Sequence, residues 1–223
     1  MGQGAFGDRS KDQWRKRRLK DQSVLEPEAG QVALSVATDL SALIMAEKNI
    51  VYFDLETQKS ADDVGGWDKI RDMRLSVGVT YSTKREGYMV YPEEKVDDLI
   101  EELMKADLIV GFNNLRFDNE VLAGYTPYDF SMIPTLDMLV YLREKLKHRL
   151  SLDAIAEASL GVQKTSEGLQ AVEWYREGKL FEIAEYCCFD VKITKMVHEY
   201  GVKHKQLFYK NRFGADQMVP VEW

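Results

Sequence analysis

The sequence predicts an α/β fold in which a mixed five-stranded sheet is flanked by helices. Two patterns predict it: β-branched and aromatic runs bounded by polar or turn residues, and apolar residues spaced three and four apart. The predicted order is three strands, helix, strand, helix, strand and then helices, which is typical of a mixed sheet with helices against it. A chain of 223 residues with 45% hydrophobic content can bury a core of this size.

The chain begins with a polar, basic segment. The first twenty residues hold seven Lys and Arg against two Asp, a local charge of +5 that leaves −12 on the remainder. We predict a mobile basic arm over residues 1–24, with a solvated tail favoured over a contact with phosphate. Residues 25–223 are expected to form a single domain that starts with a helix at 32–48.

Five segments are rich in β-branched or aromatic residues and are predicted to be strands. They cover residues 49–56, 73–82, 86–91, 108–112 and 131–136. The polar turn 83–85 joins the second strand to the third. The polar segment 57–70, which contains Gly65-Gly66, is predicted to be a loop.

Helical spacing follows in the remaining segments. Pro92 opens the first of these helices, and the others are predicted at about 117–123, 137–148, 151–160, 168–176 and 180–200. The last segment, 206–223, alternates apolar and polar residues and is predicted to be a hairpin.

Composition excludes several classes of protein. No apolar run approaches the roughly 20 residues that a membrane helix needs, and no apolar segment follows the basic stretch at 15–20, as it would in a secretory signal. The adjacent Cys187 and Cys188 cannot build a disulfide framework or a Cys-x-x-Cys metal site. We therefore expect a cytoplasmic protein without membrane association. A net charge of −7 argues against coating nucleic acid by bulk electrostatics and is compatible with carboxylates gathered around metal ions.

Two carboxylates end the first predicted strand. Asp54 and Glu56 are two residues apart, so their side chains project from the same face. They follow the apolar run 50–53, and two carboxylates at the end of a buried strand repel each other unless a cation or proton separates them. Such oxygen ligands suit Mg²⁺ or Mn²⁺. A surface pair of acids would show the same spacing.

A second cluster, GFNNLRFD at 111–118, follows the fourth predicted strand. Asp118 opens a helix there, where a carboxylate could simply interact with the helix dipole. That interpretation leaves unexplained why Asn113 and Phe117 accompany the acid at the end of a strand.

The third cluster lies on the long helix predicted at 180–200. Tyr186 and Asp190 are four residues apart and share one helix face. A phenol and a carboxylate placed in this way could reach the same metal-bound water. Taken alone, the pair fits a stabilising Tyr–Asp contact better.

In this order, the three clusters resemble the motifs of the DEDD superfamily of 3′–5′ exonucleases, which have a ribonuclease H-like fold. FDLET at 53–57 is similar to the first motif, and GFNNLRFD is similar to the second. YCCFD at 186–190 is similar to the third in its Tyr-x-x-x-Asp (DEDDy) form, since Glu185 and Tyr186 do not meet the histidine version. The similarity covers about residues 48–200 and is greatest to the exonuclease domain of family B DNA polymerases and to YprB-like proteins.

The resemblance implies two-metal phosphodiester hydrolysis at the 3′ end of single-stranded nucleic acid, with DNA favoured over RNA. Asp54 would bridge two divalent cations, Mg²⁺ or Mn²⁺. Glu56 and Asp190 would hold the ion that activates water, and Asp118 would support the second ion through water. Tyr186 would orient the attacking water. Two cations roughly 4 Å apart stabilise the attacking and leaving oxygens of an in-line displacement.

The same resemblance suggests substrate contacts. Thr57 and the backbone beside it would touch the 3′-terminal nucleotide, and Asn113 and Phe117 would line the cleft. Stacking on an unpaired base and packing in the core are equal alternatives for Phe117. Asp137 is expected to cap the next helix rather than bind metal. The histidines are scattered and expected to be structural: His148, His198 and His204.

Two other function classes fit part of the pattern. The run Asp54 to Thr57 superficially resembles the D-x-D-x-T strand end of aspartyl-phosphate phosphohydrolases, but that class needs Asp where this chain has Glu56. A catalytically weak module of the same fold could bind nucleic acid or a partner protein, although unpaired buried acids are costly without metal. A helicase or polymerase would be a sensible partner, and the sequence identifies neither.

Overall fold

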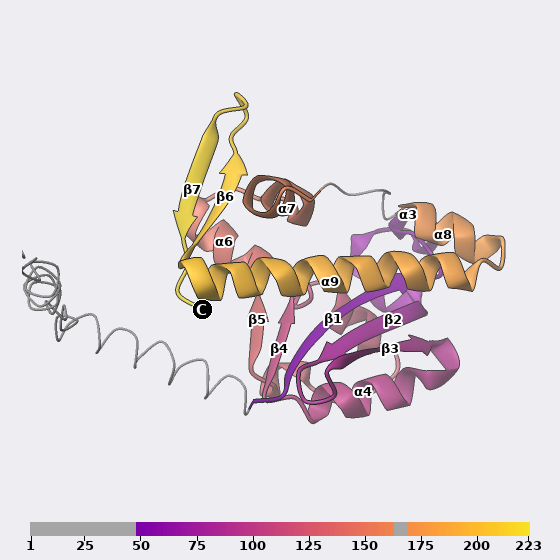
Figure 1. The fold of residues 1–223 in the computed structure, drawn as a ribbon. Coiled ribbons are helices and arrows are strands. Elements are labelled where there is room, and N and C mark those ends of the chain that lie inside the picture. The colour runs from indigo at the N-terminus through magenta and orange to yellow at the C-terminus, as the bar shows by residue number, and fades with distance from the viewer. Residues whose placement is uncertain (1–47, 163–168) are drawn as a thin grey trace, which may run out of the picture. The chain divides into compact units, whose positions relative to one another are not determined.

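A five-stranded mixed sheet with the order β3-β2-β1-β4-β5 forms the centre of the fold (Figure 1). The computed structural model describes residues 48–162 and 169–223. The strands are β1 (Ile50–Thr57), β2 (Leu75–Ser82), β3 (Gly87–Pro92), β4 (Leu108–Gly111) and β5 (Thr135–Asp137). The pairs β1–β2 and β2–β3 are antiparallel, whereas β1–β4 and β4–β5 are parallel. The predicted mixed sheet is confirmed.

Two predictions fall on residues outside the described ranges. The basic arm predicted at 1–24 lies outside them, as does the helix predicted at 32–48 apart from its last residue. The domain boundary at residue 25 therefore stays a prediction.

The parallel register gathers the ends of three strands at one edge of the sheet. Tyr52 of β1 pairs with Val110 of β4, which ends one residue later, so Asp54 and Glu56 extend past the end of β4. Gly111 pairs in turn with Asp137 at the end of β5. The loop that leaves β4 therefore starts beside the carboxylates of β1.

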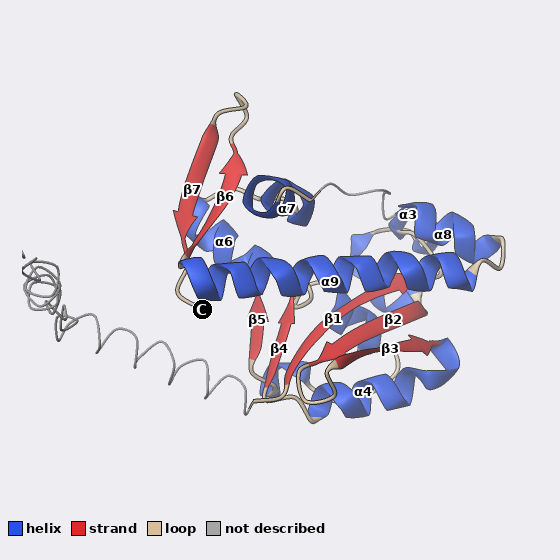
Figure 2. Cartoon of the chain, viewed as in Figure 1, coloured by secondary structure: helices blue, strands red, loops and turns tan. Residues whose placement is uncertain are grey.

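Helices cover both faces of the sheet, as Figures 1 and 2 show. The long helix α9 (Leu180–His204) crosses one face and contacts β1 and β2, and α4 (Val96–Met104) lies on the other. The buried face of α4 is the predicted one and consists of Val96, Leu99, Ile100 and Leu103. None of the helices within the described ranges is long and apolar enough to cross a membrane.

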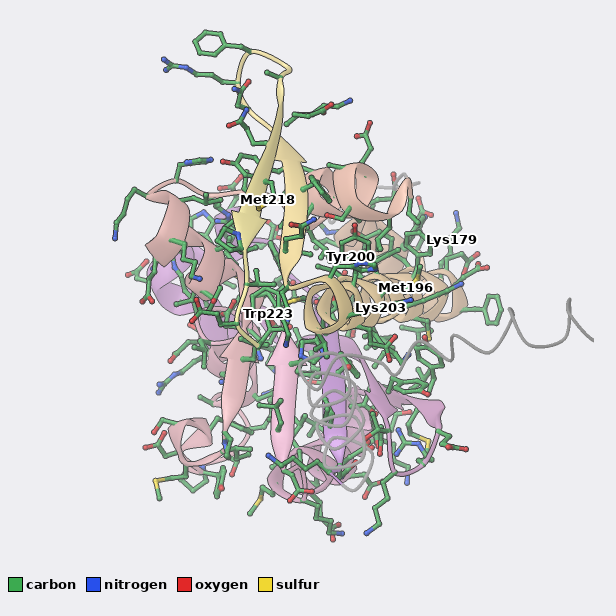
Figure 3. All side chains as sticks on the ribbon, turned by 60° about the vertical axis from the view of Figure 1, so that its left-hand side comes forward. Lys179, Met196, Tyr200, Lys203, Met218 and Trp223 are labelled. Carbon is green, nitrogen blue, oxygen red and sulfur yellow. The ribbon has the colours of Figure 1, made fainter. Side chains whose placement is uncertain are left out.

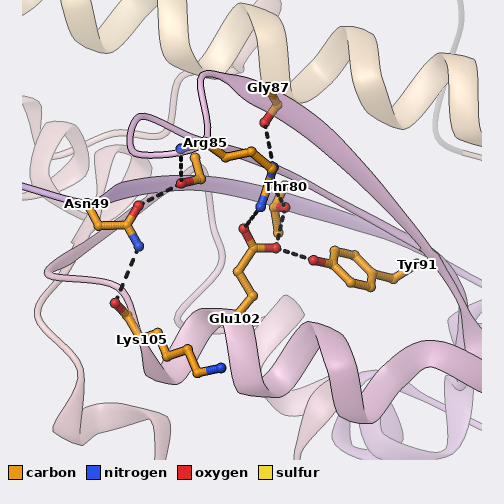
Figure 4. Close-up of polar contacts among 8 residues, drawn as sticks. Asn49, Thr80, Arg85, Gly87, Tyr91, Glu102 and Lys105 are labelled. Carbon is orange, nitrogen blue, oxygen red and sulfur yellow. Dashed lines mark hydrogen bonds and ion pairs between the residues drawn. The ribbon is translucent and has the colours of Figure 1, made fainter.

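A half-buried glutamate ties α4 to the sheet (Figure 4). Glu102 accepts hydrogen bonds from the Thr80 hydroxyl at 2.7 Å and from the Tyr91 hydroxyl, and it pairs with Arg85. Arg85 also donates to Thr80, at 3.1 Å. Every partner of this half-buried carboxylate is thus supplied by β2, β3 or the turn between them.

The predicted loop at 57–70 is wrong in part, because it contains two short helical segments. These are α3 (Ala61–Val64) and the start of the 3₁₀ segment η1 (Trp67–Met73). Ser60 and Asp63 cap α3 reciprocally, and Gly65, with φ 88°, ends it in a left-handed conformation that favours glycine. A helix of four residues is too short to leave a periodic pattern in the sequence.

The remaining elements follow the predicted order closely. They are η2 (Glu93–Lys95), α5 (Asp118–Leu122), η3 (Phe130–Met132), α6 (Met138–Leu146), α7 (Leu152–Leu160), α8 (Leu169–Arg176), β6 (Gln206–Lys210) and β7 (Asp216–Pro220). The fifth strand is shorter than predicted, because the Asp129 side chain caps a 3₁₀ turn at its expected start. The predicted hairpin is β6–β7, and it packs against α7 and α9.

After the hairpin, the chain returns to the end of α9 (Figure 3). The Trp223 indole N–H donates to the His198 backbone carbonyl at 3.2 Å, and its ring stacks on the His198 ring. The His198 Nδ1 in turn lies 2.9 Å from the Tyr52 hydroxyl of β1. This confirms a structural role for His198, which links α9 to the central strand.

Burial makes His198 a source of acid sensitivity. Burial, helped by the charge of Lys195, lowers the pKa of His198 to about 4, so the folded protein holds this ring neutral. In the unfolded chain this ring takes up a proton near pH 6.5, whereas in the folded protein it does so only near pH 4. The free energy of unfolding is therefore unaffected by His198 above about pH 6.5 and decreases as the pH falls from there towards 4. We expect His198 to cost about 2 kcal/mol of the free energy of unfolding between about pH 7.5 and pH 5.

Urea unfolding of the wild type and of His198→Gln at these two pH values measures this contribution. The variant should lose less stability on acidification than the wild type, by about the stated amount. An identical loss in both proteins would contradict the assignment.

Candidate active site

Three carboxylates converge where α9 crosses the end of β1. One oxygen each from Asp54, Glu56 and Asp190 lies within 4.8 Å of the other two, and all three side chains are half-buried. Three negative charges this close repel one another unless a cation or protons separate them. Carboxylate oxygens are the ligands that Mg²⁺ and Mn²⁺ prefer, so this donor set fits a hard divalent cation.

The carboxylates open into a cleft of about 660 Å³. Every predicted substrate contact lies in its wall, as does the fourth predicted acid, Asp118. The predicted residues that line it are Asp54, Glu56, Thr57, Asn113, Phe117, Asp118 and Asp190. Tyr186 is buried and does not line the cleft, but it lies close enough to interact with Asp54, Glu56 and Asp190. The structure therefore brings all three sequence clusters together.

Asp118 differs from the other acids because it is almost fully buried, with 2% of its surface exposed. The Leu55 backbone N–H donates to its Oδ1 at 3.1 Å, which ties it to β1 between the two acids of that strand. Burial, and after it the charge of Asp137, raises the pKa of Asp118 to about 7, although backbone hydrogen bonds act in the opposite direction. Without a nearby cation, this site favours the protonated acid.

Tyr186 remains a neutral phenol in its surroundings. Burial raises its pKa, and the charges of Asp190, Glu56 and Asp54, with a hydrogen bond to Asp190, raise it further. Trp174 of α8 packs edge-on against the ring, with centroids 6.1 Å apart. The phenol is therefore held in place and can donate or accept a hydrogen bond, but it does not ionise near neutral pH.

Cys187 contacts the site in a way that the sequence did not indicate. Its Sγ lies 3.3 Å from the Asp54 backbone oxygen and 3.6 Å from Oδ2 of the same residue. Burial, together with the charges of Asp54 and Glu56, raises the pKa of this thiol well above its usual range, so it stays protonated. The thiol thus acts as a weak donor that helps to fix Asp54.

Asp137 holds the loop that carries Asn113. Its Oδ1 accepts hydrogen bonds from the backbone N–H groups of Leu139 (3.0 Å) and Val140 (3.2 Å), which confirms it as the cap of α6. The same carboxylate accepts from the N–H groups of Asn113 at 2.9 Å and Leu115 at 3.1 Å. Asn113 adopts a left-handed conformation with φ 76° at this point.

Thr57 and Phe117, which are predicted to contact the substrate, also contact other parts of the protein. The Thr57 hydroxyl donates to the Lys59 backbone carbonyl at 2.9 Å, so it organises the turn after β1. Phe117 packs partly against the core and partly against Trp67, with ring centroids 6.3 Å apart. Trp67 also lines the cleft, and the prediction of a plain loop missed it. The only sequence signal was a tryptophan directly after a Gly-Gly pair in a polar segment.

Comparison with known families identifies the same region. A family model described as the RNase H superfamily matches residues 51–202, which include all four acids and Tyr186. No curated protein matches the chain.

We expect Asp118→Asn to stabilise the metal-free protein. Because the folded pKa of Asp118 is raised to about 7, the penalty of burying its charge is absent below about pH 4, grows between about pH 4 and pH 7, and is constant above this range. The variant's melting temperature should therefore exceed that of the wild type by about 3 °C or more at about pH 8, and by less at about pH 5.

Asp137→Asn is the matched control, since the same chemical change there replaces one of two carboxylate oxygens that together accept from four backbone N–H groups. Its melting temperature should fall, because a lost acceptor leaves backbone donors unpaired. Thermal unfolding in EDTA measures both variants. A melting temperature for Asp118→Asn below that of the wild type at about pH 8 would show that the Asp118 charge is stabilised by the protein alone.

Proposed function

The chain belongs to the RNase H superfamily, and on this basis we propose that it is a metal-dependent 3′–5′ exonuclease. Its substrate would be single-stranded nucleic acid with a free 3′ end, DNA in preference to RNA, and its reaction would be phosphodiester hydrolysis. The observation that carries the proposal is the convergence of Asp54, Glu56 and Asp190 at the wall of one cleft. The ordered motifs, with Tyr186 four residues before Asp190, support the exonuclease assignment.

The acids divide into two groups by their exposure. Asp54, Glu56 and Asp190 are half-buried and face one another, so they would hold one divalent cation directly. Asp118 is almost fully buried in the wall of the same cleft and would support a second cation. Two such cations, Mg²⁺ or Mn²⁺, would place positive charge beside the attacking and leaving oxygens of an in-line displacement.

Tyr186 would position the attacking water rather than deprotonate it. Its raised pKa keeps the phenol neutral, and its hydrogen bond to Asp190 places the hydroxyl beside the carboxylates. A positioned hydroxyl lowers the barrier by fixing the direction of attack, which is an entropic contribution. Its removal should therefore slow the reaction less than removal of an acid.

A binding module of the same fold is the weaker alternative. A buried carboxylate such as Asp118 destabilises a protein that never binds a cation, because burial disfavours its charge. A protein that only held nucleic acid would gain nothing from this cost. The volume of the cleft also falls in the range typical of sites for small ligands, which suits the terminal nucleotide of a nucleic-acid strand.

Asp54→Asn should abolish the exonuclease activity that we propose. With 5′-labelled single-stranded DNA and Mg²⁺ or Mn²⁺, the wild type should give a ladder of products shortened from the 3′ end. EDTA should remove the ladder, and the variant should be slower by on the order of 100-fold or more, because it loses the bridging charge.

Glu185→Gln is the control for this experiment, since Glu185 is an exposed acid on α9, the helix that carries Asp190, and lies outside the carboxylate cluster. It should retain wild-type activity. A parallel RNA substrate tests the preference for DNA. Absence of cleavage of either polymer by folded wild-type protein would refute the proposed activity, and cleavage that survives Asp54→Asn would refute the site.

Tyr186→Phe should lower kcat by roughly 10- to 100-fold with little change in KM. The variant keeps the ring that packs against Trp174 and loses only the hydroxyl. Steady-state kinetics on the same DNA substrate measures both constants. An unchanged kcat would exclude Tyr186 from the reaction and leave it a purely structural contact of Asp190.

A further inference from the structure

A second cavity, of about 430 Å³, adjoins the cleft of the carboxylates. The two cavities share Trp67, Asn113 and Phe117 in their walls, so they meet at the Trp67–Phe117 pair. Ile70, Arg116 and Arg149 complete the second cavity. Among residues 48–162 and 169–223, its wall contains two arginines and no acid, in contrast with the cleft.

Trp67 is displayed at this junction. It is 64% exposed, and it packs against Phe117 at a tilt of 60°. The preceding Gly65 and Gly66 have φ values of 88° and 136°, which are conformations that favour glycine. These two residues therefore form the turn that leads from α3 to Trp67. An indole left open to solvent beside a cavity offers a face on which an unpaired base can stack.

Arg116 and Arg149 supply positive charge from two separate segments. Arg116 lies in the loop after β4, and Arg149 lies between α6 and α7. Both are exposed, and neither forms an ion pair with an acid of residues 48–162 or 169–223. In a chain with a net charge of −7, two cations without ion-pair partners at one cavity are suited to bind an anion.

We propose that this cavity binds the nucleotide on the 5′ side of the scissile bond, with its base against Trp67 and its phosphate near Arg116 and Arg149. The inference rests on the proposed function, in which the 3′-terminal nucleotide occupies the acidic cleft. The rest of the nucleic-acid strand must leave that cleft. The adjoining cavity offers it an aromatic face, and two arginines that can neutralise a phosphate away from the proposed metal site. Through stacking and charge, this cavity would favour binding of oligonucleotides over mononucleotides.

Two substrates separate this cavity from the reaction centre. A fluorescein-labelled ten-nucleotide oligo(dT) needs both sites, whereas the p-nitrophenyl ester of thymidine 5′-monophosphate has only one nucleotide. For Trp67→Ala, and for the double variant Arg116→Gln/Arg149→Gln, kcat/KM should fall about tenfold more on the oligonucleotide than on the ester. Equal losses on both substrates, or no loss on the oligonucleotide, would overturn the inference.

The tip of the β6–β7 hairpin provides matched controls. Phe213 is 79% exposed, more than Trp67, and Arg212 precedes it; neither lines either cavity. Phe213→Ala and Arg212→Gln should therefore leave the ratio of the two activities at its wild-type value. A ratio altered to the same extent by these variants would overturn the inference.

Binding distinguishes failure of this inference from failure of the proposed function. Fluorescence anisotropy on the Asp54→Asn background measures the Kd of the oligonucleotide without turnover. Trp67→Ala should raise Kd about tenfold, and the double arginine variant should lower the slope of log Kd against log salt by about 1. If the wild type cleaves neither substrate, the proposed function fails, and the binding measurements alone test the second cavity. An unchanged Kd for Trp67→Ala and an unchanged salt slope for the double arginine variant would then overturn the inference.

Discussion

Concentrated negative charge at the end of β1 is the constraint on which this site depends. Asp54, Glu56 and Asp190 place carboxylate oxygens within 4.8 Å of one another, and Asp118 is buried beside them. This arrangement is unfavourable in the empty protein, since burial and mutual repulsion both oppose ionisation. Bound cations would reverse this balance, so under the proposed function the stability that this geometry costs would be recovered in the metal-bound state.

The surrounding structure supplies the rigidity that this geometry needs. The central strand β1 is fixed by neighbours on both sides and by the Tyr52–His198 contact with α9, so that Asp54 and Asp190 keep their relative positions. Leu55 holds Asp118 through its backbone N–H, and Cys187 contacts Asp54 from α9. The acids are thus positioned by rigid elements and hydrogen bonds, as a reaction centre requires.

Local patterns predicted the elements and much of the site, whereas contacts between distant segments could not be predicted. Strand alternation placed Asp54 and Glu56 on one face, and helical spacing did the same for Tyr186 and Asp190. The loop after β4 was recognised because a polar cluster followed a buried strand. Trp67 was missed because the turns around it are too short to show periodicity. Arg149 joins Arg116 at one cavity only through the packing of the fold.

Anomalous diffraction from crystals soaked in Mn²⁺ tests the central claim most directly, because it locates the cation without relying on activity. The account predicts an Mn²⁺ peak bound by Asp54, Glu56 and Asp190, with a second peak on the Asp118 side of Asp54 when an oligonucleotide is present. Well-ordered carboxylates with no Mn²⁺ peak between them would contradict the account, since nothing would then offset the charge gathered at the end of β1.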